Sequence, residues 1–364
     1  MEDHVPSSSS TPPPLRAGII GCSGIAIAAG ERSNAPRRTP LPHSHASAFH
    51  AVPDTIVAAV CDVVPASTKR YVELWGPVPE YIDYRQMFDR EQLDIVSIVT
   101  PDHLHADIFV DACKAGIKGI FCEKPISTTL ADADRMIDAA GRYGVKVVVN
   151  NTRRFDPFYR QAKWLIEQGT IGKLTRVLGT MGGERAMLFR NGTHLADTIA
   201  FFANSTPAWL IAELDDGERR WGTAYMGTGG RDAASEPGAS AYIHFKNGVR
   251  GIYNGSKCTT TNFELDLQGE SGRIRISDQF AELSLPVEGG GLTTQSLPMT
   301  RDMPSGMVTA VNELVAMVRA NVGDASALRD GRATLEILLG ILVSADACSA
   351  RVDFPLVEGA SAAS

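Results

Sequence analysis

Short apolar runs alternate with amphipathic stretches along the first 150 residues. Each run is rich in Ile, Val and Ala, which is typical of strands buried on both faces of a parallel sheet. The stretches 106–115 and 130–143 between them repeat apolar residues at helical spacing. The pattern predicts a doubly wound parallel sheet with a ligand crevice at the carboxyl ends of its strands. The predicted strands are 17–20, 56–61, 95–99, 119–122 and 145–149.

The pattern changes after about residue 150, where apolar and polar positions alternate as in antiparallel strands with one buried face. An Asn247-Gly248 pair separates two such runs and favours a tight hairpin turn. Amphipathic helices at 307–320 and 330–350 close the chain. We therefore expect an α/β protein in which an α+β domain with an open, mostly antiparallel sheet follows the first domain. The expected divisions are a disordered tail at 1–14, a first domain at 15–150 and a second at 151–364, whose last helix can pack back on the first.

Composition narrows the class of protein. A formal charge of −7 and no run of Lys or Arg argue against a nucleic-acid partner. No apolar window approaches the length of a membrane span, and the acidic start of the chain is unlike a signal peptide. The six cysteines occur singly, which favours a reducing cytoplasm over a disulfide framework.

A glycine-rich loop follows the first predicted strand directly. It fits the dinucleotide fingerprint G-x-G-x-x-G/A if a serine stands in for the second glycine. Its first glycine permits a tight turn, its last alanine allows close helix packing, and free N–H groups at a helix start would face a pyrophosphate. An ordinary turn between strand and helix is the alternative for the loop alone. The loop consists of Gly21, Cys22, Ser23, Gly24, Ile25 and Ala26.

Asp62 ends the second predicted strand, where a carboxylate can accept hydrogen bonds from the adenosine ribose. Such an acid favours NAD over NADP. It lies farther from the glycines than the usual 20 or so residues, and an inserted, proline-containing loop at 30–42 explains the excess. Lys69 and Arg70 nearby leave NADP open as an alternative.

Polar residues also follow the third and fourth predicted strands and so lie beside the predicted crevice. Thr100-Pro101 and His105 follow the third, and Glu123-Lys124-Pro125 follow the fourth. A lysine directly after a buried strand is costly unless it is paired or useful, because desolvation disfavours its charge. As a bare tripeptide, the same sequence is also typical of a solvated turn.

His194 opens a predicted helix, with Asp197 one turn later on the same face. The positive end of a helix lowers the pKa of an imidazole and keeps it neutral, as a general base must be. A capping or packing role is the alternative. His43, His45 and His50 lie in the inserted loop or the following helix and carry less weight. No carboxylate or thiol spacing completes a metal site around any histidine pair, so no metal is expected.

Together these motifs, in this order, resemble the Gfo/Idh/MocA family of oxidoreductases. The resemblance implies a Rossmann domain that binds NAD or NADP, an open sheet used for homo-oligomer contacts, as a dimer or tetramer, and a catalytic centre at Lys124 and His194. Its further motifs are Asn151-Thr152-Arg153-Arg154-Phe155, Gly169-Thr170-Ile171-Gly172-Lys173 and Arg329-Asp330-Gly331. The implied cofactor-binding residues are Gly21, Ser23, Gly24, Ile25, Asp62, Thr100, Pro101, His105, Glu123 and Lys124.

One position departs from the family. Many of its dehydrogenases have an Asp four residues before this histidine, where it orients the ring, and this chain has Arg190. Either Asp197 or Glu184 then has to help, or the substrate differs, since a guanidinium suits a carboxylate or phosphate. Candidate substrate contacts are therefore Arg153, Arg190 and Asp197.

The function expected from these residues is hydride transfer between nicotinamide and a secondary alcohol of a sugar, polyol or glycoside, with either Lys124 or His194 as the base. Three alternatives stay open. A lyase or glycosidase could act through a transient keto-sugar, a non-catalytic sensor could only bind NAD, and an unrelated doubly wound protein would bind no dinucleotide. The sequence names neither the sugar nor the carbon that is oxidised.

Overall fold

The computed structural model describes residues 12–27, 43–215, 221–227, 232–258, 262–298 and 304–356. Most of the predicted tail at 1–14, and all of the predicted inserted loop at 30–42, lie outside the described residues.

The first sheet is six-stranded and wholly parallel, with the strand order β3-β2-β1-β4-β5-β6. The order reverses between β1 and β4, which opens the crevice of a doubly wound fold at their carboxyl ends. The predicted fold class is therefore confirmed, although the two-residue edge strand β3 has no counterpart among the predicted strands. The strands are β1 (Leu15–Ile20), β2 (Thr55–Cys61), β3 (Glu80–Tyr81), β4 (Ile95–Ile98), β5 (Gly119–Cys122) and β6 (Lys146–Val149).

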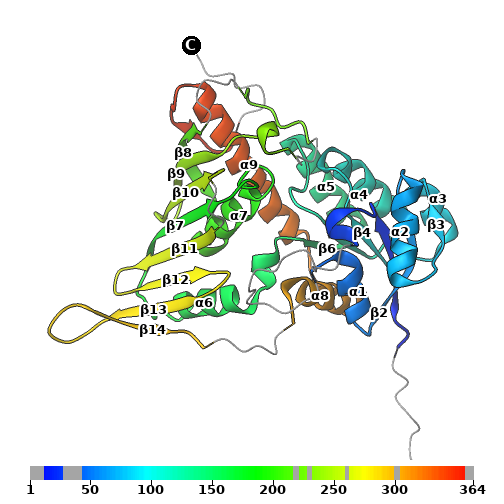
Figure 1. The fold of residues 1–364 in the computed structure, drawn as a ribbon, viewed down its shortest axis with the longest axis horizontal. Helices are drawn as coiled ribbons and strands as arrows, with labels where there is room; N and C mark the ends of the chain where they lie inside the picture. The colour runs from blue at the N-terminus through cyan, green and yellow to red at the C-terminus, as the bar shows by residue number, and fades with distance from the viewer. Residues whose placement is uncertain are drawn as a thin grey trace, which may run out of the picture.

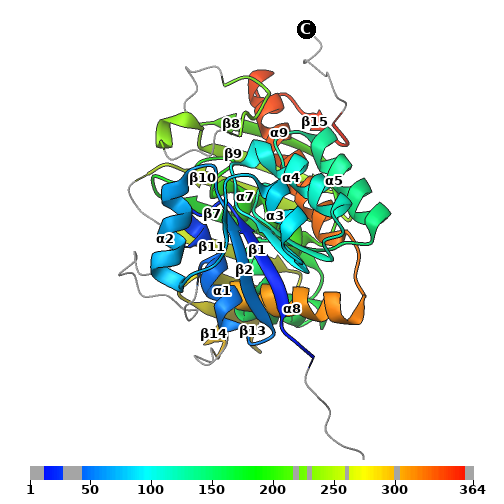
Figure 2. The ribbon, with the colours of Figure 1, turned by 90° about the vertical axis from the view of Figure 1, so that its right-hand side faces the viewer.

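Helices cover both faces of this sheet (Figure 2). One apolar cluster joins it to α4 and α5, and the other joins it to α1 and to α8, a helix from the end of the chain. The chain thus returns to the first domain, through α8 as well as through α9, which contacts α5 and β6. The helices named here are α1 (His45–Ala51), α2 (Pro65–Trp75), α3 (Tyr84–Arg90), α4 (His105–Lys114), α5 (Leu130–Tyr143), α8 (Gly306–Ala320) and α9 (Ser326–Asp346).

The second sheet has nine strands in the order β14-β13-β12-β11-β7-β10-β9-β8-β15, and every pair except β7 and β10 is antiparallel. Helices α6 (Pro157–Glu167), α7 (Gly192–Ala203) and α9 lie on its side nearer the first domain (Figure 1). The strands are β7 (Leu174–Gly182), β8 (Pro207–Leu214), β9 (Ala239–Phe245), β10 (Arg250–Ser256), β11 (Asn262–Gly269), β12 (Arg273–Ser277), β13 (Ala281–Pro286), β14 (Leu292–Ser296) and β15 (Val352–Asp353).

The predicted hairpin joins β9 to β10. Gly248 has a φ of +87°, a conformation that glycine adopts without strain, and the N–H of Phe245 donates to the carbonyl of Val249 at 2.9 Å. Short 3₁₀ turns at Gly24–Ala26, Asp102–Leu104, Thr152–Phe155 and Ala233–Ser235 connect other elements. In the described ranges, no helix has the length and apolar character needed to cross a bilayer.

Candidate active site

The glycine loop leaves β1 and turns sharply beside the next strand. Gly21 has a φ of +87°, and a Cβ there would lie 2.6 Å from the carbonyl oxygen of Val99, so only glycine fits. Gly24 also has a positive φ, and no atom lies within 4 Å of the place where its Cβ would be. Ser23 has an extended backbone and, with Ile25, an exposed side chain. The loop therefore presents a bare, open surface of the kind that a pyrophosphate needs.

The element after this loop differs from the prediction. A single 3₁₀ turn at Gly24–Ala26 follows, and in the described part of the chain the next helix is α1, which begins at His45. Within the described residues, no α-helix therefore starts directly after the loop, where the fingerprint would place helical N–H groups. Residues 28–42 between the two elements lie outside the described part of the chain.

Asp62 holds the glycine loop to the end of β2. Its two carboxylate oxygens accept the N–H of Cys22 at 2.7 Å and the N–H of Val64 at 2.9 Å. A carboxylate offers about four acceptor positions, so two remain for ribose hydroxyls. Of the two cations that kept NADP open, Arg70 lies on α2 and pairs with Glu73 at 3.2 Å.

The loop after β4 contacts the loop after β5 through His105. This buried ring lies with Nδ1 2.9 Å from the carbonyl oxygen of Pro125 and Nε2 2.9 Å from that of Thr100. Both nitrogens are therefore occupied, and His105 positions the two loops rather than offering its ring to a cofactor. The Thr100 hydroxyl, in contrast, is buried without a hydrogen-bond partner among the described residues, so a polar cofactor group could satisfy it.

Glu123 anchors the Glu-Lys-Pro segment at the end of β5. Its carboxylate lies 2.9 Å from Nε2 of His45 and accepts the side-chain amide of Asn150 at 2.5 Å. It also accepts the N–H of Lys124 at 3.1 Å. Burial alone would raise the pKa of Glu123, but the hydrogen bond and charge of His45 outweigh it and hold that pKa well below its usual range.

Lys124 points from this segment toward the start of α7. Its ammonium donates to the backbone carbonyl of Arg190 at 2.5 Å. Burial lowers the pKa of Lys124 to about 8, against the opposing charge of Glu123. The nearby charge of Arg190 also lowers it. Burial therefore disfavours the charged form of Lys124, as expected for a lysine after a buried strand. Near neutral pH its amine can hold or release a proton.

His194 is the third residue of α7, in the first turn as predicted. Burial lowers its pKa well below the usual value, and the charges of Lys124 and Arg153 lower it further. The lowered pKa was predicted from the helix dipole, whereas desolvation of the buried ring is the larger cause. Lys124 and His194 therefore belong to one site, because the charge of Lys124 acts on the His194 ring and the Lys124 ammonium binds the carbonyl of residue 190.

Asp197 lies one turn further along α7 but belongs to a different network. It is buried and accepts hydrogen bonds from Asn151 at 2.8 Å and from the guanidinium of Arg154 at 2.9 Å. Thr334 of α9 is a third partner, at 3.3 Å. Its placement favours a positioning role over a direct substrate contact. In the described chain, no hydrogen bond joins the His194 ring to Asp197 or to the exposed Glu184.

The two arginine candidates differ in their surroundings. Arg153 pairs with Asp278 at 2.8 Å, and its guanidinium lies over the ring of Phe263, 3.3 Å from the centroid. Arg190 is half-buried, and neither a hydrogen bond nor an ion pair engages its guanidinium within the described ranges. Of these two arginines, Arg190 is therefore the one whose guanidinium has no polar partner in the described part of the chain.

Three contributors to this site were not predicted from the sequence: His45, Asn150 and Tyr225. The Tyr225 hydroxyl donates to the Asp102 carboxylate, and its ring stacks on Phe189 with centroids 3.8 Å apart. Residues 221–227 thus reach from the second domain to the loop after β4. Nothing local in the sequence indicates this, because the partners lie more than 100 positions apart.

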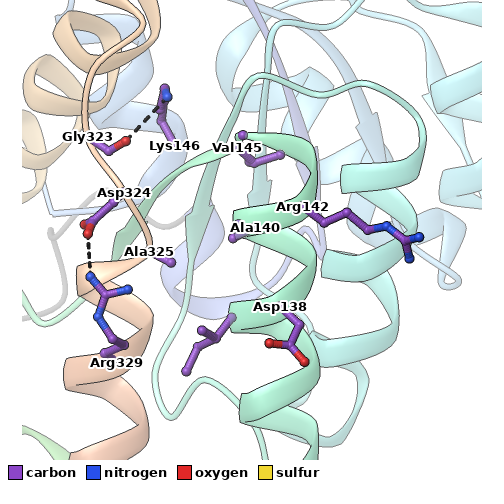
Figure 3. A pocket seen from close by; sticks show the side chains of 12 residues that line it. Asp138, Ala140, Arg142, Val145, Lys146, Gly323, Asp324, Ala325 and Arg329 are labelled. Carbon is purple, nitrogen blue, oxygen red and sulfur yellow. Dashed lines mark hydrogen bonds and ion pairs between the residues drawn. The ribbon is translucent and has the colours of Figure 1, made fainter.

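The structure also has a surface pocket of about 470 Å³ at another place, between the end of α5 and the loop before α9. Figure 3 shows Asp324 and Arg329 on one wall and residues of α5 on the other. Neither Lys124 nor His194 lines it. In the described part of the chain, no cluster of three or more His, Cys, Asp or Glu side chains could hold a metal ion.

Comparison with known proteins finds a family whose NAD-binding domain resembles the first domain. Residues 15–151 match the model of an oxidoreductase family with an NAD-binding Rossmann fold. Myo-inositol 2-dehydrogenase of Thermotoga maritima is 26% identical over 238 residues, which cover 63% of this chain and 70% of that enzyme. Inositol 2-dehydrogenase of Salmonella typhimurium is 34% identical over 125 residues, 34% of this chain and 37% of that one.

A solved structure extends the likeness to both domains. The crystal structure of myo-inositol 2-dehydrogenase from Lactobacillus plantarum superposes with a TM-score of 0.70, covering 93% of this chain and 99% of that one. Its sequence identity of 21% makes this a likeness of fold. Over residues 15–151 the chain therefore resembles the Gfo/Idh/MocA family of NAD-binding oxidoreductases, and over the second domain the likeness to such an enzyme is one of fold.

Proposed function

We propose that this protein transfers a hydride between nicotinamide and a secondary alcohol of a sugar or polyol. One observation carries the proposal: the ammonium of Lys124, two residues after β5, donates to the backbone carbonyl of residue 190 at 2.5 Å, four positions before His194 in the first turn of α7. The names of the two inositol 2-dehydrogenase relatives support a polyhydroxylated ring as the substrate class.

The cofactor we propose is NAD. Gly21, Gly24 and the exposed Ser23-Ile25 segment would face the pyrophosphate, and Asp62 would accept the ribose hydroxyls. The same carboxylate would repel the 2′-phosphate of NADP. The unpartnered hydroxyl of Thr100, with Pro101 and the Glu123-Lys124 segment, would lie along the nicotinamide half. When bound, nicotinamide supplies the hydride acceptor in oxidation and the donor in reduction.

The chain's own residues would supply proton handling and orientation. His194 is neutral at pH 7 because its pKa is low, so its ring can accept the hydroxyl proton of the substrate. Lys124, held by the carbonyl of residue 190, would donate a hydrogen bond to the reacting oxygen and stabilise negative charge as it develops there. Because Glu123 and His105 fix the loops, this geometry is set before substrate arrives.

We also propose a homo-oligomer that forms through the second sheet. A row of apolar side chains crosses four of its strands on the face away from the helices, since Ile211 pairs with Tyr242, Tyr242 with Ile252, and Ile252 with Leu178. Ile211 is 40% exposed, and the others are half-buried. A second copy of this chain would cover the row. Light scattering tests this: Tyr242→Glu should give monomers, and a wild-type monomer would refute the proposal.

An absorbance screen at 340 nm tests the activity. Sugars, inositols, glycosides and sugar acids are offered to the purified protein with NAD and, separately, with NADP. We expect NADH formation from at least one compound, and a higher kcat/KM with NAD. Glycoside cleavage without net NADH would instead favour the lyase alternative, and NAD binding without any turnover would favour a sensor.

A further inference from the structure

Several positive charges act on the proposed catalytic pair. Burial is the main reason why the pKa values of Lys124 and His194 are low, but nearby guanidinium groups contribute in the same direction. The contributing cations are Arg153, Arg185 and Arg190. The charges of Glu123 and Asp102 act in the opposite direction, so the partners of the nearby acids decide which cations stay unpaired.

The acids near this pair already have partners. Glu123 binds His45 and Asn150, and Asp102 accepts the hydroxyl of Tyr225. Further acids are also in use: Glu236 accepts the N–H of Phe189 at 2.7 Å, Asp278 pairs with Arg153, and Asp197 pairs with Arg154. None of them forms an ion pair with Arg190 in the part of the chain that the structure describes.

The backbone on both sides of Arg190 is held firmly. Phe189 is fixed by its stack on Tyr225 and by its N–H bond to Glu236. The carbonyl of Phe189 also accepts the hydroxyl of Thr193 at 2.7 Å. Arg190 itself accepts the Lys124 ammonium on its carbonyl. A guanidinium without a hydrogen-bond or ion-pair partner among the described residues is therefore carried on a fixed backbone, whose carbonyl binds the proposed catalytic lysine.

We propose that the substrate is an anionic sugar or polyol whose carboxylate or phosphate binds Arg190 while its carbinol meets Lys124 and His194. This inference rests on the proposed function and narrows its substrate class. A guanidinium fork accepts either anion through two parallel hydrogen bonds, which fixes the orientation of the substrate as well as its affinity. At this position the arginine would thus act as a specificity determinant.

Matched substrates test the effect of the negative charge on kcat/KM separately from the effect of the sugar ring. D-glucuronate and D-galacturonate are compared with their neutral uronamides and parent sugars, and glucose 6-phosphate and galactose 6-phosphate form the phosphate arm. We expect kcat/KM for the carboxylates or the phosphates to exceed that of the neutral partners at least about tenfold. Higher kcat/KM for the neutral member of every pair would overturn the inference while leaving the proposed function intact.

Substitutions of Arg190 test whether this residue causes the preference for anionic substrates. Arg190→Met should lower kcat/KM for the preferred anion roughly 10- to 100-fold more than kcat/KM for its neutral counterpart, and Arg190→Lys should recover part of the loss. Arg142→Met is the control, because Arg142 is exposed on α5 and points away from Asp324 and Arg329 (Figure 3). An equal loss for anion and uronamide in Arg190→Met would contradict the assignment.

A binding measurement keeps the inference testable without turnover. The melting temperature of the protein with NADH is recorded with each uronate and each uronamide. We expect a larger increase with the uronate in the wild type and in Arg142→Met, and equal increases in Arg190→Met. Equal increases in the wild type would refute anion recognition, whereas binding of uronates without any turnover would count against the proposed function alone.

Discussion

Nε2 of His45 lies 2.9 Å from Oε1 of Glu123, and its Nδ1 lies 2.7 Å from the hydroxyl of Ser97. The imidazole is fully buried, and no part of it reaches the proposed substrate. It acts on the site through Glu123, whose carboxylate also receives the N–H of Lys124. Helix α1 is thus connected to the proposed catalytic lysine through the side chains of His45 and Glu123.

His45→Ala should destabilise the protein by about 2 kcal/mol, because a buried carboxylate loses a hydrogen-bond partner. The pKa of Glu123 should then rise, since the His45 bond is what holds it low. Urea unfolding measures the loss, and a double-mutant cycle with Glu123→Gln isolates the coupling. Additive effects of the two substitutions would show that the pair contributes nothing.

Gly21→Ala should weaken cofactor binding and lower the melting temperature, because the new Cβ would meet the carbonyl of Val99. Gly141→Ala is the matched control. It lies within α5, a Cβ there meets no atom within 4 Å, and the change should stabilise the protein by about 0.5–1 kcal/mol. NADH fluorescence titration and thermal melting report both effects. Unchanged NADH affinity in Gly21→Ala would count against the loop as the pyrophosphate site.

The pH dependence of alcohol oxidation distinguishes the roles of the pair. Burial lowers the pKa of Lys124 to about 8, so the ammonium that stabilises the reacting oxygen is lost as the pH rises through that value. We expect kcat/KM to fall above about pH 8 and to show no inflection near 6.5, because His194 is already neutral there. In Arg190→Met the alkaline limb should move to higher pH, since one cause of the lowered pKa is removed. An increase in kcat/KM through pH 8 would instead identify neutral Lys124 as the base.

The Arg154–Asp197 pair should contribute strongly to stability. Asp197 is buried, so Arg154→Met would leave its carboxylate without its charged partner, at a cost of about 3 kcal/mol. Arg351→Met is the control, because Arg351 pairs with Asp353 where both side chains are mostly exposed, and it should change stability by less than about 1 kcal/mol. Equal changes in the free energy of unfolding would contradict the assigned role of the buried pair.

Most strands of the first domain could be predicted from the sequence, because each of them is a compact apolar run. Gly119–Cys122 was predicted to the residue, and the other predicted strands differ from the observed ones by one or two positions. Strand β14 escaped prediction, since all of its residues are exposed and it lacks a buried face. The domain boundaries and the cytoplasmic location stay predictions.

The site was predictable only where chemistry coincides with the end of a strand or the start of a helix. Lys124 follows β5 and His194 lies in the first turn of α7, and the pKa values of both are lowered, as their positions predict. His45 could not be found in this way, because its partner Glu123 lies 78 residues along the chain. The role of Asp197 was also hidden, since it depends on Arg154 and on α9 packing beside α7.

Single-turnover kinetics with Lys124→Ala and His194→Ala tests the central claim most directly. On the substrate found by the screen, each variant should transfer hydride at least about 100-fold more slowly than the wild type, while NADH still binds, because neither residue holds the glycine loop. Near-normal hydride transfer in either variant, with folding and NADH binding intact, would contradict the assignment of that residue.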